Sequence, residues 1–159
     1  MSLRSATAVL PPARCVPLQT MHMTDHAGRV LVVDADPNMC DLCAQTLRRV
    51  GFDVELADAA PVAMAHLRAH AFDLVLLESS APERGDDSLL AQIRAHDVNL
   101  PVLLVSGAAT VAQVADALRL GIHGLLQKPF QPDELCVVAV EIVEKRRAAR
   151  ARERVAALR

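Results

Sequence analysis

The sequence predicts an α/β fold in which five parallel strands form one doubly wound sheet. Between residues 29 and 142, short apolar runs alternate with segments whose apolar residues recur every three or four positions. Apolar runs of this kind are typical of strands buried on both faces, and the periodic segments are typical of helices that cover a sheet. Five such units fit in about 115 residues, whereas an eight-unit barrel needs at least ~200.

The five apolar runs are the expected strands, and they lie at Val30–Val33, Val54–Ala57, Leu74–Leu77, Val102–Val105 and Leu125–Leu126. Each expected helix begins near a residue that suits an N-cap or first turn, namely Asp36, Asp58, Asp87, Thr110 and Gln131. Gly51 and Gly121 mark two helix ends. With right-handed crossovers, this pattern predicts a flavodoxin-like (βα)5 sheet of strand order 2-1-3-4-5.

The chain divides into three parts. Residues 1–28 contain three prolines, show no helical or strand period, and are expected to form a disordered leader. Residues 29–142 form the single folded domain. Residues 143–159 are rich in arginine and predict either a basic helical extension of the last helix or a linker. An apolar residue every seven positions, from Leu135 to Ala156, leaves open a connecting helix toward another domain or protomer.

The amino-acid composition argues against several classes of protein. A net charge of −2 argues against broad attraction to nucleic acid, and 2% aromatic residues leave few rings for base stacking. No apolar run approaches the ~20 residues that span a membrane. Four scattered cysteines do not form the framework of a small disulfide-rich domain. We therefore expect a cytoplasmic protein.

Polar residues follow the apolar runs at the point where each expected strand ends. Asp34 and Asp36 follow the first run, Glu78 the third, Ser106 the fourth, and Lys128 with Pro129 the fifth. Ligands of open parallel sheets bind outside the carboxyl ends of the strands. Acids, a hydroxyl and an amine are therefore expected at one edge of the sheet.

In this order and spacing, the segments RVLVVDADPN, FDLVLLESSAP, LPVLLVSGAA and GLLQKPF resemble the receiver domain of bacterial response regulators, over residues 29 to about 142. The resemblance implies a phosphorelay switch. An Asp after the third strand takes a phosphoryl group from a histidine kinase, with a magnesium ion held by the acids after the first strand. It further implies partner binding on the surface formed by the fourth helix, fifth strand and fifth helix, and a fused or downstream output domain.

Matches to the family pattern are Asp34 for the first acid, Ser106 for the switch hydroxyl, Lys128 for the phosphoryl-binding lysine, and Pro129 for the proline after it. Three positions depart from the family pattern. Glu78 stands at the phosphoacceptor position, Ala35 replaces a magnesium-ligand acid, and Leu125 replaces an aromatic switch residue. Asp36 lies one position too late in the sequence to replace the magnesium-ligand acid that is missing at Ala35. It is expected to cap a helix instead.

These departures predict poor or absent phosphorylation, and no cofactor apart from weak Mg²⁺ binding by Asp34 and Glu78. Glu78 has two open interpretations. Its longer side chain pairs with Lys128 or Ser106 and imitates the phosphorylated form, or it points at water and is inert.

Three hypotheses result. The leading one is a degenerate, non-enzymatic receiver module that signals by protein–protein contact with a kinase, another signalling protein or a second copy. The second is a working magnesium-dependent phosphoacceptor. The third, from a different class, is a flavodoxin-like cofactor-binding or enzymatic domain.

Two other pairs of residues suggest metal or redox chemistry. Cys40 and Cys43 are spaced like a redox or zinc pair, but they lie inside an expected helix with no second pair. They are interpreted as core thiols. His66 and His70 are one helical turn apart and suit a metal, yet no third ligand is evident in the sequence, so we expect a solvated helix face.

Overall fold

The computed structural model describes residues 28–78, 88–107 and 110–158. Five parallel strands form one sheet in the order β2-β1-β3-β4-β5, which confirms the predicted fold. The elements, in chain order, are β1 (Gly28–Val33), α1 (Pro37–Arg49), β2 (Phe52–Ala57), α2 (Ala60–Ala69), β3 (Leu74–Glu78), α3 (Leu89–His96), β4 (Val102–Ser106), α4 (Val111–Arg119), β5 (Gly124–Gln127) and α5 (Pro132–Ala157). The leader expected at residues 1–28 lies outside the described residues except for Gly28, which begins β1.

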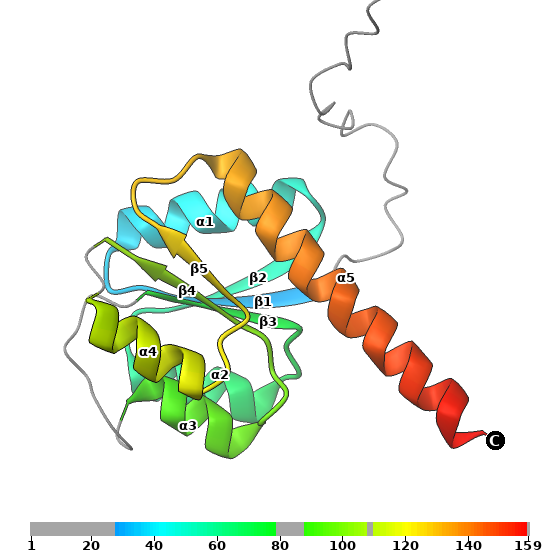
Figure 1. Ribbon diagram of the computed structural model, residues 1–159. Helices are drawn as coiled ribbons and strands as arrows, with labels where there is room; N and C mark the ends of the chain where they lie inside the picture. The colour runs from blue at the N-terminus through cyan, green and yellow to red at the C-terminus, as the bar shows by residue number, and fades with distance from the viewer. Residues whose placement is uncertain (1–27, 79–87, 108–109, 159) are drawn as a thin grey trace, which may run out of the picture.

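Helices cover both faces of the sheet. Figure 1 shows α1 and α5 on one face and α2, α3 and α4 on the other. Side chains of β1 alternate between the two cores: Val30 and Val32 pack toward α1 and α5, whereas Leu31 and Val33 pack toward α2 and α3. Both faces of β1 are thus buried, which explains its unbroken apolar sequence.

The strand register brings four strand ends to the same edge of the sheet. Val33 pairs with Leu77, so Asp34 lies level with Glu78. Glu78 itself pairs with Val105, directly before Ser106. On the other side of β4, the backbone N–H of Lys128 donates to the Ser106 carbonyl at 2.8 Å. Residues separated by more than 90 positions in the chain therefore meet at one rim.

Two of the predicted helix starts are confirmed with their caps. Asp36 precedes Pro37 and accepts a hydrogen bond from the Asn38 backbone N–H at 2.9 Å. Thr110 forms a capping box with Gln113, each side chain accepting from the backbone N–H of the other. These contacts satisfy amide groups that have no partner within the helix.

Of the other three predicted starts, one is wrong, one lies outside the described residues, and one is confirmed without a side-chain cap. Ala59, not Asp58, is the N-cap of α2, and no side chain caps this helix. Asp87 lies outside the described residues, and Ser88 caps α3 by accepting from the Ala91 N–H at 3.1 Å. Gln131 is the N-cap of α5, as predicted, but its side chain makes no capping hydrogen bond. Acids in the first turn of α5 stabilise that end instead.

Two glycines end helices as predicted. Gly51 and Gly121 have φ angles of +94° and +74°, directly after the C-caps Val50 and Leu120. A left-handed backbone costs a residue with a Cβ atom about 1 kcal/mol or more, so glycine suits both positions.

The last helix is much longer than the others. Its first half packs against the sheet through Leu135, Ala139, Ile142 and Val143, all of them buried. Its second half runs past the domain into solvent (Figure 1), and residues 151–158 are exposed. At 1.5 Å per residue, α5 is about 39 Å long. In the described part of the chain, no helix has the length and apolar character needed to cross a membrane.

Replacing a core leucine is expected to destabilise the domain strongly. Leu47 in α1 is fully buried, so Leu47→Ala should lower the free energy of unfolding by about 2–5 kcal/mol. Val98 is 71% exposed, and Val98→Ala should change it by less than about 0.5 kcal/mol. Urea denaturation of both variants measures these values, and equal losses would contradict the assignment of the core.

Candidate functional site

The centre of the site is the Lys128 ammonium, which lies between two carboxylates. Its Nζ atom is 3.3 Å from Asp34 Oδ2 and 3.4 Å from Glu78 Oε1, within hydrogen-bonding distance of both. The three side chains come from the ends of β1, β3 and β5. The predicted meeting of strand ends therefore occurs, and Glu78 is directed toward Lys128.

Asp34 is nearly buried, with 6% of its side chain exposed, and both of its oxygens have partners. Oδ1 accepts from the Asp36 backbone N–H at 2.9 Å, while Oδ2 contacts Lys128. Asp36 is exposed, and its Oδ1 caps α1. Ala35 offers no side-chain oxygen.

This arrangement does not suit a magnesium ion. Magnesium requires near-octahedral coordination by oxygen atoms, several of them from water. The acids after β1 are instead engaged by N–H groups and an ammonium. Among residues 28–78, 88–107 and 110–158, no group of three or more potential ligand side chains is arranged to hold a metal ion.

The other predicted site residues belong to β4, to β5 and to the segment after β5. Ser106 is buried at the end of β4, and its carbonyl holds the backbone of Lys128. The Lys128–Pro129 peptide bond is cis. Leu125 pairs with Leu104 earlier in β5, and its side chain is exposed on the edge strand, away from the carboxylates.

One neighbour of the site was missed by sequence reasoning. The Cys40 thiol donates to the backbone carbonyl of Asp34 at 3.1 Å, so α1 contacts the site directly. The only signal in the sequence was the core position of Cys40 on its helix. Burial raises the pKa of Cys40 and raises that of Cys43 to about 11. Neither thiol forms a disulfide, consistent with the core interpretation.

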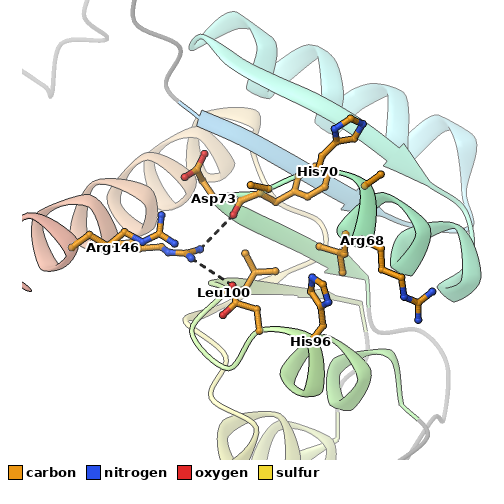
Figure 2. A pocket seen from close by; sticks show the side chains of 12 residues that line it. Arg68, His70, Asp73, His96, Leu100 and Arg146 are labelled. Atoms are coloured by element: carbon orange, nitrogen blue, oxygen red, sulfur yellow. Dashed lines mark hydrogen bonds and ion pairs between the residues drawn. The ribbon is translucent and has the colours of Figure 1, made fainter.

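A cavity of about 440 Å³ lies at the opposite, amino-terminal edge of the sheet. Figure 2 shows Arg146 of α5 reaching into it beside Asp73 and Leu100. The Arg146 guanidinium donates to the Phe72 carbonyl at 3.5 Å and lies 3.7 Å from an Asp97 carboxylate oxygen. This arginine therefore joins α5 to the segment before β3 and to the C-cap of α3.

Comparison with known proteins identifies the family. Residues 30–140 match the model of the response regulator receiver domain, and the chain belongs to this family. It is 33% identical over 113 residues, 71% of this chain, to the transcriptional regulatory protein ZraR of Escherichia coli strain K12. It is also 29% identical over 129 residues, 81% of this chain, to the transcriptional regulatory protein FixJ of Bradyrhizobium diazoefficiens. The match covers 26% of ZraR and 63% of FixJ, so the chain spans only part of both relatives.

Solved structures agree with this family. A CheY-like receiver domain protein from Methanospirillum hungatei has a TM-score of 0.71 and 25% identity, covering 76% of this chain and 97% of that one. NtrX from Brucella abortus, solved in complex with ADP, has a TM-score of 0.69 and 30% identity, covering 83% of this chain and 30% of that one. The chain is thus the receiver domain of a two-component response regulator. Family membership favours the two signalling hypotheses over the cofactor-binding or enzymatic one.

Removing the ammonium should destabilise the domain. Lys128→Met leaves two nearly buried carboxylates without their cation, so we expect a loss of about 3–5 kcal/mol at neutral pH. The loss should be smaller when Glu78→Gln is also present, because one of the two negative charges is then absent. Denaturant titration of the single and double variants measures this coupling.

The matched control is Arg119→Met. Arg119 and Asp116 form an exposed pair at 3.5 Å on α4, and such pairs are worth about 0–1 kcal/mol. If Lys128→Met costs no more than Arg119→Met, the site cluster does not stabilise the domain.

Cys43 should resist alkylation in the native protein. With a pKa near 11, its thiolate fraction at pH 8 is more than about 100-fold lower than that of free cysteine. Native labelling by iodoacetamide should be slower by at least that factor. The rate should rise about tenfold for each pH unit below 11, because deprotonation rises with pH. Mass spectrometry of peptides from native and unfolded protein measures both rates, and equal rates would contradict the burial of Cys43.

Proposed function

We propose that this chain is a receiver module that signals by protein–protein contact and does not accept a phosphoryl group at position 78. The observation that supports this proposal best is the contact of Lys128 with Glu78. According to the family pattern, the lysine after the fifth strand binds the phosphoryl oxygens. Here the carboxylate of Glu78, which stands at the phosphoacceptor position, already contacts the Lys128 ammonium.

The chemistry of transfer also argues against phosphorylation of Glu78. A glutamate carboxylate lies about 1.5 Å farther from the backbone than that of aspartate, the length of one carbon–carbon bond. In-line phosphoryl transfer depends on positioning, and a displacement of about 1 Å can cost 10²-fold in rate. The lack of an acid at Ala35 weakens magnesium binding further, so the developing charge has no adequate counter-ion.

Glu78 reproduces part of the phosphorylated state. It places a charge of −1 beside Lys128, where a phosphoryl group would carry about −2. We therefore infer that the contact between Glu78 and Lys128 holds the domain in one signalling state. This inference develops the first interpretation of Glu78 in preference to the inert one, since the Glu78 side chain is only 12% exposed.

The proposed contact surface lies on α4, β5 and α5. Large apolar side chains are exposed there: Val111 and Leu118 on α4, Leu125 on β5 and Val137 on α5. Each is an exposed apolar side chain of the kind that protein interaction sites use. The proposed partners are a histidine kinase or another signalling protein, a second copy of this chain, and a fused or separate output domain.

Incubation with acetyl phosphate and Mg²⁺ tests the proposal. The intact mass of the protein should not change, whereas a phosphorylated receiver gains about 80 Da, the mass of one phosphoryl group. A stable gain of this size, lost in Glu78→Gln, would establish the second hypothesis, a working phosphoacceptor.

The double variant Ala35→Asp with Glu78→Asp should restore the reaction. It supplies a magnesium ligand and shortens the acceptor, so we expect the mass gain and Mg²⁺-dependent stabilisation in thermal denaturation. Ala35→Asp with Glu78→Asn is the control, because it has the same length at position 78 but no carboxylate. A double variant that stays unmodified would mean that these positions are wrongly assigned.

A further inference from the structure

Charge is segregated along α5. Residues 132–144, its first half, carry four acids and no cation, a formal charge of −4. Residues 145–158 carry six cations and one acid, a formal charge of +5. The helix dipole favours acids before bases, but its effect is confined to the first and last turns. Glu141, Glu144 and Lys145 lie in the middle of α5, so the dipole does not account for their order.

One face of α5 is exposed from end to end. Its residues are spaced alternately four and three positions apart, as on the contact face of a paired helix. We call this face the α5 seam, and it consists of Val137, Glu141, Glu144, Ala148, Ala151, Val155 and Leu158. Val137 and Val155 are each 57% exposed. The buried residues of α5 lie on the opposite side of the helix, against the sheet.

We propose that two copies of this chain pair along the α5 seam with their helices antiparallel. The acidic half of each helix then lies beside the basic half of the other. A parallel pairing would instead set a charge of +5 against +5, and like charges that face each other across an interface are costly. Antiparallel pairing about a two-fold axis is self-complementary, so that each contact occurs twice.

The side chains of the seam favour one register of the two helices. With Val137 of one copy opposite Val155 of the other, each exposed valine covers an exposed valine. The same register sets Glu141 opposite Ala151, whose small side chain lets the helices approach closely. Arg154 lies three residues after Ala151 and therefore on the same helix surface, where it can pair with the Glu141 carboxylate of the other copy.

The shape of the domain leaves room for this pairing. Each domain packs on the side of α5 opposite to the seam, and the second half of the helix projects beyond the domain (Figure 1). The two domains would thus lie on opposite sides of the helix pair. The inference rests on the proposed function, in which a second copy is one of the partners. None of its contacts involves position 78, so a failure here leaves the acetyl phosphate test unaffected.

Sedimentation velocity of the full chain over a concentration series tests the proposal. We expect a reversible monomer–dimer equilibrium that weakens with salt, since raising the ionic strength from about 0.1 M to about 1 M shortens the Debye length from about 10 Å to about 3 Å. Glu141→Arg should weaken the dimer by at least about tenfold, because symmetric pairing replaces two attractions by two repulsions.

The matched control is Glu153→Arg. It makes the same change of net charge on the same helix, but position 153 lies outside the seam and in the basic half. This variant should not weaken the dimer. Circular dichroism checks that both variants fold, which is expected because Glu141 and Glu153 are exposed.

Cross-linking tests the direction of the helices. Chains with Val137→Cys and with Val155→Cys are mixed and oxidised, and mass spectrometry of peptides identifies the residues that are joined. A disulfide between positions 137 and 155 supports the antiparallel pairing, whereas one between two copies of position 155 would show a parallel pair and overturn it. A chain that stays monomeric at every concentration, or a dimer that Glu141→Arg leaves intact, would also overturn the proposal.

Discussion

The site depends on one electrostatic constraint, the need to neutralise two carboxylates held close together at the edge of a parallel sheet. Asp34 and Glu78 lie level on neighbouring strands and are both largely buried. The backbone N–H of Asp36 and the ammonium of Lys128 supply the compensation. Because the charge of Lys128 is shared by both acids, a change at any one of the three positions alters the balance for the others.

The same constraint explains how the departures from the family pattern fit together. Loss of the acid at position 35 removes one negative charge from the pocket, and the longer side chain at position 78 brings the remaining carboxylate to the lysine. Lys128 contacts both of the remaining carboxylates, Asp34 and Glu78.

The fold and most of the site could be predicted because they depend on local patterns. Alternating apolar runs identified the five strands, and the residue after each run identified the rim, since parallel strands all end at the same edge. Long-range side-chain contacts could not be predicted this way. The pairing of Glu55 with His66, the thiol contact of Cys40 with Asp34, and the reach of Arg146 to Phe72 each join residues whose sequence neighbourhoods show no sign of the partner. The start of α2 was missed because Asp58 suits an N-cap by type, while the helix begins one residue later without a side-chain cap.

The attachment of α5 at Arg146 has a mechanical consequence. The helix starts four residues after Lys128 and is gripped by Arg146 fourteen residues further along, about 21 Å away, with about 16 Å of helix beyond. The buried side chains between Leu135 and Val143 also hold the first half of the helix against the sheet. Because an α-helix is stiff over this length, a displacement of the packed half moves the solvent-exposed end with it. A rearrangement around Lys128 that shifts α5 is therefore transmitted to whatever the exposed end of the helix contacts.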